Sequence, residues 1–230
     1  MAMQLEKVVP FGRSLDEYQR IFNLDETDRQ KRILGVGDGP ASFNAEATPL
    51  GWQVTSIDPL YEFSGAEILD RFNQVVDDII QQIENSPGDW VWSYHKSPDD
   101  LRQNRLKALQ AFIADYELGK QQGRYRLEAL PHLQCADQSF DLALCSHLLF
   151  LYSDHYDLQF HLDAIQEMLR VSAEVRIFPL LTLMLQRSPY LDAVVQTFSD
   201  RGYEVTIVPV YYELQKGGNQ MLQILRSTIA

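Results

Sequence analysis

Three glycines at alternate positions, directly after a short apolar run, most constrain what this chain can fold into. They are Gly35, Gly37 and Gly39, and the apolar run before them begins at Ile33. Glycine adopts backbone conformations that other residues avoid, so the pattern is typical of a tight strand-to-helix turn whose backbone approaches a ligand closely. The same spacing occurs in turns that bind nothing, so the glycines alone leave a structural and a functional interpretation open.

A second apolar run, residues 53–57, ends directly before Asp58. In nucleotide-binding α/β folds, an acidic residue about 20 residues after a glycine-rich turn accepts hydrogen bonds from ribose hydroxyls. The glycine turn and Asp58 together therefore predict a site for a nucleoside cofactor.

Length and composition predict a single domain with its own core. A chain of 230 residues with 45% hydrophobic residues can bury roughly 70% of its unfolded surface around one core. A formal net charge of −12 disfavours nucleic acid as a partner, because phosphate backbones require a basic surface.

The longest apolar run, residues 178–185, is too short to span a bilayer. No cleavable leader is visible either, so we expect a cytoplasmic protein that does not bind membranes. The sequence indicates no oligomeric state.

The order of apolar runs predicts a mostly parallel sheet. The expected strands lie near residues 32–35, 53–57, 124–128, 140–145, 174–179, 203–209 and 220–226. Helical patterns lie between most of them, which is typical of right-handed crossovers, and another helix is expected before the first strand, over 15–24. The loop between the last two strands, which contains Gly217 and Gly218, is too short for a crossover helix, so these strands should be antiparallel.

The connection between the second and third strands, residues 61–123, is far longer than usual. It contains helical patterns over 66–83 and 98–118, and we expect it to form a lid or cap. Between the two helices, Trp90, Trp92 and Tyr94 alternate with smaller residues and would share one face of an extended segment. These aromatic side chains anchor the insertion to the core, wall a substrate pocket, or do both.

Two further landmarks complete a recognisable order. Residues 138–147, QSFDLALCSH, contain a turn, a buried strand and a polar strand end, and the amphipathic helix 164–170 leads into the strand 175–179. With the glycine turn and the acid after the second strand, this order resembles the class I S-adenosylmethionine-dependent methyltransferases, from Lys31 onward. The resemblance implies a three-layer Rossmann-like α/β sandwich with seven mostly parallel strands and an antiparallel last strand. In a nicotinamide-dependent dehydrogenase, the last strand of the sheet would normally be parallel to the others.

The resemblance also implies S-adenosylmethionine as cofactor, a set of cofactor-binding residues and, in Glu128–Leu130, the loop that binds adenine. The implied cofactor-binding residues are Gly35, Gly37, Asp38, Gly39, Asp58, Pro59, Glu128, Ala129, Leu130 and Ser146. One departure from the family pattern stands out, because the acidic residue that usually ends the first strand is Gly35 here. Asp38, inside the turn, either supplies this negative charge or serves as a turn or helix-capping residue.

The chemistry implied by the resemblance requires little of the protein, because a sulfonium methyl group is already activated. A catalytic base is optional, and His147 is the candidate because it directly follows the fourth strand, at the edge where ligands bind. A histidine at this junction can instead simply hydrogen-bond the backbone. We therefore expect a methyltransferase with an unidentified small-molecule acceptor. The alternatives are a non-catalytic S-adenosylmethionine or S-adenosylhomocysteine-binding module, which Gly35 keeps open, and a nicotinamide-dependent oxidoreductase.

No metal site is expected from the sequence. Cys135 and Cys145 lack the paired spacing of zinc ligands, and we expect both to be reduced and buried. His155 and His161, near Asp154, are six residues apart, which does not place their imidazoles on one face of a helix.

Overall fold

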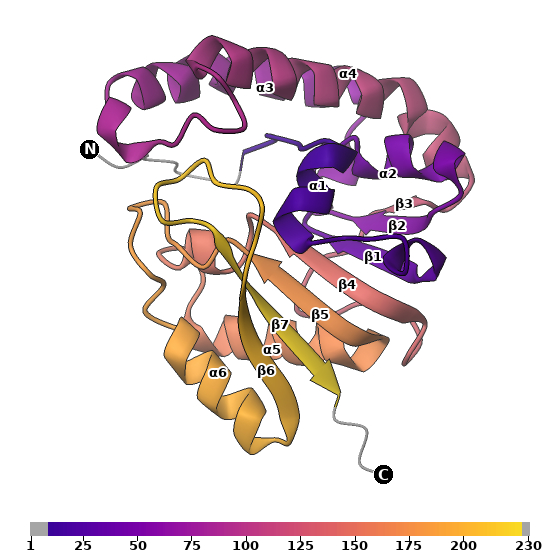
Figure 1. Ribbon diagram of the computed structural model, residues 1–230. Helices are drawn as coiled ribbons and strands as arrows, with labels where there is room; N and C mark the ends of the chain where they lie inside the picture. The colour runs from indigo at the N-terminus through magenta and orange to yellow at the C-terminus, as the bar shows by residue number, and fades with distance from the viewer. Residues whose placement is uncertain (1–8, 227–230) are drawn as a thin grey trace.

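The apolar runs form the strands of one central sheet. The computed structural model describes residues 9–226, and its sheet has the strand order β3-β2-β1-β4-β5-β7-β6 (Figure 1). The strands are β1 (Arg32–Val36), β2 (Gln53–Ile57), β3 (Tyr125–Arg126), β4 (Phe140–Ser146), β5 (Ser172–Phe178), β6 (Tyr203–Pro209) and β7 (Gln220–Arg226). All neighbouring strands are parallel except β7, which is antiparallel to both β5 and β6. The predicted fold class, including the antiparallel last strand, is confirmed.

Within residues 9–226, six α-helices connect or flank the strands. They are α1 (Leu15–Phe22), α2 (Phe43–Ala47), α3 (Gly65–Glu84), α4 (Pro98–Gln121), α5 (Leu158–Val171) and α6 (Leu191–Asp200). Short 3-10 helices cover Asp28–Gln30, Thr48–Leu50, Pro59–Glu62, Pro87–Asp89 and Phe150–Tyr152. Helix α1 ends two residues before the predicted 24 because Asn23 takes a left-handed conformation and caps it. Strand β3 is shorter than the predicted 124–128.

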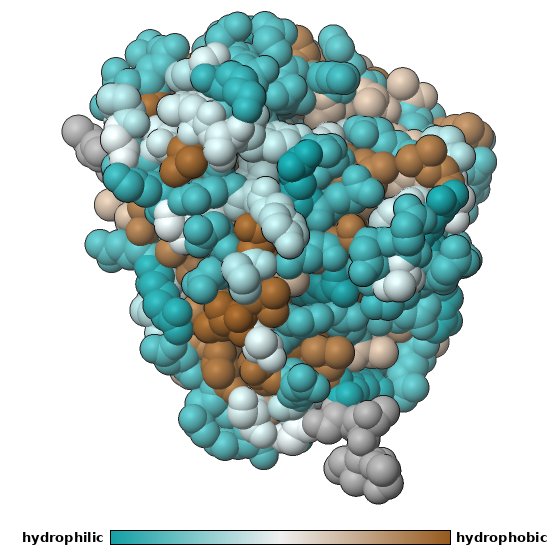
Figure 2. Space-filling model, viewed as in Figure 1, coloured by the Kyte–Doolittle hydropathy of each residue, from teal (hydrophilic) through white to brown (hydrophobic). Residues whose placement is uncertain are grey.

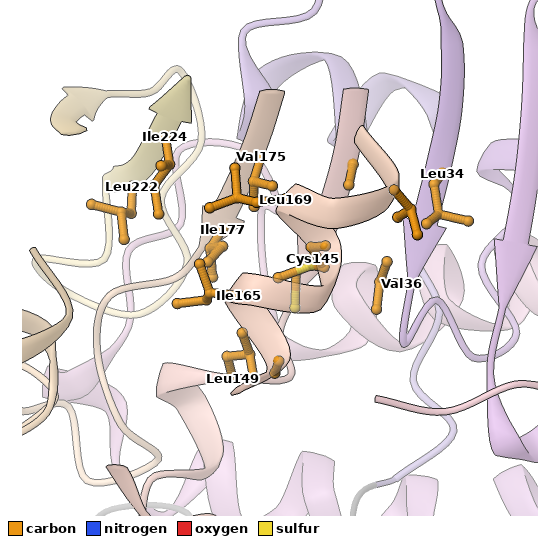
Figure 3. Packing of buried hydrophobic residues seen from close by; sticks show 14 of the residues in the cluster. Leu34, Val36, Cys145, Leu149, Ile165, Leu169, Val175, Ile177, Leu222 and Ile224 are labelled. Carbon is orange, nitrogen blue, oxygen red and sulfur yellow. The ribbon is translucent and has the colours of Figure 1, made fainter. Parts of the chain in front are cut away.

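Alternating side chains of the inner strands supply a core on each face of the sheet. In β4, Ala143 and Cys145 belong to the cluster under α5 and α6, whereas Leu142 and Leu144 belong to the cluster under α1 and α2. Figure 3 shows Ile165 and Leu169 of α5 beside β-strand residues of the first cluster. Burying one such leucine or isoleucine side chain contributes about 1.5–3 kcal/mol. Both faces are thus covered by helices, which gives the predicted three layers.

The insertion forms a third cluster of its own. Its helices α3 and α4 pack against each other along the top of the molecule in Figure 1, and α4 also contacts α2 and β3. Each helix begins at a serine, Ser64 or Ser97, whose side chain accepts a hydrogen bond from the first turn. The contact with β3 is close, because a Cβ atom on Gly119 would lie 2.3 Å from the ring of Tyr125. The sequence pattern of two long helices is confirmed.

The aromatic residues of the insertion do not share one face. Trp90 and Trp92 belong to the cluster of α3 and α4, and the Trp90 indole donates to Ser86 Oγ over 3.1 Å. Tyr94 instead packs against Tyr212, with ring centroids 5.2 Å apart, and belongs with the cluster under α1 and α2. These contacts favour an anchoring role, and Trp90 in addition lines a cavity, so the two interpretations hold together for this residue.

The surface is polar over most of the face seen in Figure 2, with one area of hydrophobic side chains over β6 and β7. Within residues 9–226, no helix combines the length and the apolar character that crossing a membrane would require. Cys135 and Cys145 are both buried and form no disulfide.

Candidate active site

A cavity of about 1060 Å³ lies at the carboxyl edge of the sheet. The residues that follow β1, β2 and β4 line it together with the loop after β3 and one side of α3. This is the edge at which open α/β sheets bind ligands. The predicted site residues that line it are Gly37, Asp38, Gly39, Asp58, Pro59, Glu128, Ala129, Leu130, Ser146 and His147. Gly35 alone among the predicted residues does not.

The turn after β1 requires glycine at two positions. Gly37 and Gly39 have φ values of +66° and +52°, in the left-handed region that favours glycine. A Cβ atom on Gly37 would also lie 2.6 Å from Leu148 Cδ2. The backbone N–H of Gly37 donates to the Ile57 carbonyl over 2.9 Å, which fixes the turn to the end of β2.

Gly35 has a different reason to lack a side chain. A Cβ atom built on it would lie 1.9 Å from Asp38 Oδ2 and within 2.6 Å of the other two carboxylate atoms. The carboxylate of Asp38 therefore fills the space that an acidic side chain at position 35 would enter. The space in which the family pattern puts an acidic side chain is thus occupied by an acidic side chain from three residues further along the chain.

Side chains from two other elements hold the Asp38 carboxylate. The Tyr18 hydroxyl of α1 donates to Oδ1 over 2.7 Å, and the Ser56 hydroxyl of β2 donates to Oδ2 over 2.6 Å. Asp38 does not cap α2, since the N-cap of that helix is Ser42. Burial raises the pKa of Asp38 to about 7, against the opposing effect of these hydrogen bonds.

This raised pKa predicts how Asp38 contributes to stability. Between pH about 4, where a carboxyl group titrates in an unfolded chain, and pH about 7, folded Asp38 keeps a proton that the unfolded chain has released. Its contribution to the free energy of unfolding should therefore fall as the pH rises through this window and level off above it. Urea unfolding measures the free energy of unfolding at pH 5 and at pH 8. Between these two pH values it should fall by more in the wild type than in Asp38→Asn. Equal losses in the two proteins would contradict the assignment.

Asp58 pins the glycine turn and keeps acceptor capacity free. Its Oδ2 accepts the backbone N–H of Gly39 over 2.8 Å, and its Oδ1 accepts that of Leu60 over 2.7 Å. Burial raises its pKa, while these two hydrogen bonds oppose the shift. Each carboxylate oxygen has two lone pairs, so one on each oxygen is left for a hydroxyl donor. Tyr61, two residues after Pro59, donates its hydroxyl to the Gly39 carbonyl over 2.9 Å and holds the turn from the other side.

The loop after β3 is fixed by its own hydrogen bonds. Glu128 accepts the backbone N–H of Gln134 over 2.8 Å, and Ala129 forms an isolated antiparallel bridge with His132. Ala129 and Leu130 thereby form part of the cavity wall. The side chain of Leu130 in this wall offers an apolar surface against which the face of a flat ring can pack.

His147 lies where this cavity meets a second, smaller one. Its backbone has φ +55° and its N–H donates to the Phe178 carbonyl over 2.6 Å. The imidazole Nδ1 lies 2.9 Å from the hydroxyl of Ser146. Burial, and then the positive charges of Arg13 and Arg105, hold the pKa of His147 well below its usual value. The ring is therefore neutral, and one of its nitrogens can accept a proton.

The other histidines singled out in the sequence lie elsewhere. His161 is buried in α5, stacked on Phe150, and its Nδ1 lies 2.7 Å from the Asp157 carbonyl oxygen, so it packs within the core. Neither His155 nor His161 lines either cavity. Residues 9–226 contain no cluster of three or more His, Cys, Asp or Glu side chains arranged to hold a metal ion.

The structure brings to this site several residues that sequence reasoning missed. Arg13 precedes α1 and lines both cavities, and Arg71, Gln74 and Asp78 line the larger one from α3. No motif marks them, because each reaches the cavity through a contact between distant segments. The helical period of α3 is a signal that one of its faces is polar, but not that this face meets a ligand site.

Comparison with known proteins bears on the fold. No protein-family model matches the chain. The crystal structure of magnesium protoporphyrin IX methyltransferase from Synechocystis PCC 6803 with bound S-adenosylhomocysteine aligns with a TM-score of 0.50 and 13% identity, covering 93% of this chain and 81% of that one. An O-methyltransferase family protein from Burkholderia thailandensis aligns with a TM-score of 0.49 and 11% identity, covering 94% of this chain and 58% of that one. The fold is that of the class I S-adenosylmethionine-dependent methyltransferases.

At the level of sequence, the chain is 33% identical over 225 residues to the uncharacterized protein MJ0045 of Methanocaldococcus jannaschii. The alignment covers 97% of this chain and 99% of that protein. This chain belongs to the same protein family as MJ0045.

Proposed function

We propose that this protein is an S-adenosylmethionine-dependent methyltransferase whose acceptor is a small molecule. One observation carries the proposal. A glycine turn with two left-handed glycines, the buried carboxylate of Asp38, the half-buried carboxylate of Asp58 and the 128–130 loop line one cavity at the carboxyl edge of a class I methyltransferase fold. The predicted cytoplasmic location, and the predicted absence of nucleic-acid and membrane partners, belong to the same proposal.

The residues of the cavity fit this cofactor. S-adenosylmethionine supplies, when bound, a methyl group that its sulfonium has already activated. Asp58 has free lone pairs for the two ribose hydroxyls. Asp38, neutral over much of the physiological range when the site holds no cation, becomes a carboxylate beside an ammonium group, because a nearby opposite charge favours the ionised form.

The rest of the site has to orient an acceptor and exclude water. Holding the reactants in the right orientation can lower the activation barrier of a transfer reaction by roughly 7–11 kcal/mol. His147, neutral and at the junction of the two cavities, is placed to accept a proton from the acceptor, and Ser146 fixes its ring. Helix α3 serves as the lid in this proposal, supported by its residues on the cavity wall, among them Val75 and Ile79.

The alternatives lose their main support. A non-catalytic binding module was kept open by Gly35, but the contact between position 35 and Asp38 accounts for that glycine on steric grounds. A nicotinamide-dependent oxidoreductase fits poorly with the antiparallel β7.

Calorimetric titration with S-adenosylmethionine, S-adenosylhomocysteine and NAD tests the proposal. We expect the first two to bind with similar affinity and NAD at the same concentration to give no heat of binding. Hydrogen exchange with and without S-adenosylhomocysteine tests the lid, and amides of α3 should exchange more slowly in the complex. Binding of NAD but not of S-adenosylhomocysteine would overturn the function, and unchanged exchange in α3 would overturn the lid.

A further inference from the structure

A second cavity, of about 80 Å³, adjoins the larger one and differs from it in character. The two share Val9, Phe11, Arg13, Ile79 and His147. Most other side chains around the second cavity are apolar, among them Ile83, Trp90, Leu101, Leu151, Leu183 and Leu214. The polar residues that line it are either cationic or neutral: Arg13, Arg105, His147, Tyr152, Tyr212 and Gln215. The acidic side chains of the larger cavity do not line the second one; they are Asp38, Asp58, Glu62, Asp78 and Glu128.

The charge of Arg105 is already balanced. Its guanidinium, fully buried, donates to Glu17 Oε2 over 2.8 Å, and Glu17 is also buried. His95 Nε2 lies 3.3 Å from Glu17 Oε1, but burial lowers the pKa of His95 and keeps the ring neutral. Glu17 and Arg105 therefore form a matched ion pair with no negative charge left over.

Arg13 has no such partner. Within residues 9–226 it forms no ion pair shorter than 4.0 Å, and the one hydrogen bond of its guanidinium goes to the Phe11 carbonyl, over 2.6 Å. Its Nε is buried and has no hydrogen-bond partner among the described atoms. Burial and the charge of Arg105 lower its pKa to about 10, so Arg13 keeps its positive charge at neutral pH. A half-buried cation whose Nε is buried without a partner is costly, and it is the group that a bound anion would compensate.

We propose that the methyl acceptor carries a carboxylate on an apolar body, with the carboxylate paired to Arg13 and the body in the second cavity. This inference rests on the proposed function and deepens it. A planar guanidinium binds a carboxylate through two parallel hydrogen bonds, and the apolar walls favour a ring or a short alkyl chain. A second source of a carboxylate is the methionine part of the cofactor, since Arg13 lines both cavities. The experiment separates the two.

The test is calorimetric titration of the protein, saturated with S-adenosylhomocysteine, with octanoate, phenylacetate and indole-3-acetate and with their primary amides. At least one acid should bind, and its amide at least tenfold more weakly. Arg13→Gln should weaken binding of that acid at least tenfold and leave the affinity for S-adenosylhomocysteine within twofold. Arg102→Gln is the matched control, because it removes the same charge from an exposed arginine that pairs with Asp77 and lines neither cavity.

Each outcome decides the proposal. Loss of S-adenosylhomocysteine affinity in Arg13→Gln would assign Arg13 to the cofactor and overturn the inference while the proposed function stands. Failure of the wild type to bind S-adenosylhomocysteine would overturn the proposed function itself. Equal binding of acids and amides, or binding of no acid, would refute the inference alone. Arg13→Lys covers the case in which Arg13→Gln does not fold, because it keeps the charge, loses the paired hydrogen bonds and should weaken acid binding by a smaller factor.

Discussion

Replacing Asp58 with alanine is expected to weaken the binding of S-adenosylhomocysteine at least tenfold. A hydrogen bond to a charged group contributes roughly 1.5–3 kcal/mol, and Asp58 has a free lone pair on each oxygen for the two ribose hydroxyls. The substitution also releases the backbone N–H of Gly39, so the glycine turn loses a contact that holds its shape. Titration calorimetry of the two proteins measures the loss.

Two further variants show where such a loss originates. Asp58→Asn keeps one acceptor oxygen and should lose less affinity than Asp58→Ala. Asp70→Ala, on the exposed side of α3 and away from the cavity, removes the same charge and should leave the affinity unchanged. If Asp58→Ala folds and still binds S-adenosylhomocysteine as the wild type does, Asp58 is not the ribose-binding residue.

The sheet and most of the cavity were predictable because both depend on local patterns. Each inner strand is a short apolar run, and the residues after β1, β2 and β4 meet at one edge in any parallel sheet. The antiparallel β7 followed from loop length alone. Ten of the eleven predicted site residues line the cavity, because the loop after β3 reaches the same edge. The exception is Gly35, whose neighbouring space the Asp38 carboxylate fills.

The remaining features depend on contacts that no local pattern encodes. Tyr18 reaches Asp38 across 20 residues, and Arg105 reaches Glu17 across 88. No sequence pattern marks Arg105 as an interior residue, yet it is fully buried because Glu17 compensates its charge. The period of a helix indicates which residues share a face but not which distant side chain meets that face. The separation of Tyr94 from Trp90 has the same origin, since it depends on Tyr212 near the other end of the chain.

Replacing Gly35 with alanine is expected to destabilise the protein by about 1–3 kcal/mol, the usual cost of overpacking a buried site. The added Cβ would lie 1.9 Å from Asp38 Oδ2, and the carboxylate cannot yield freely because Tyr18 and Ser56 both hold it. Moving it aside would break hydrogen bonds to a buried group, which adds to the steric cost. Urea unfolding at a fixed pH measures the change in the free energy of unfolding.

A double-mutant cycle isolates the contact between positions 35 and 38. In an Asp38→Gly background the space beside Gly35 is open, so Gly35→Ala should there be neutral or slightly stabilising, since alanine loses less conformational entropy on folding than glycine. Gly88→Ala is the matched control, because no atom lies within 4 Å of the Cβ that it adds. If Gly35→Ala costs as much with Asp38 absent as with it present, the carboxylate is not what excludes a side chain at position 35. A clear coupling would establish that the Asp38 carboxylate occupies the space that a side chain at position 35 would enter.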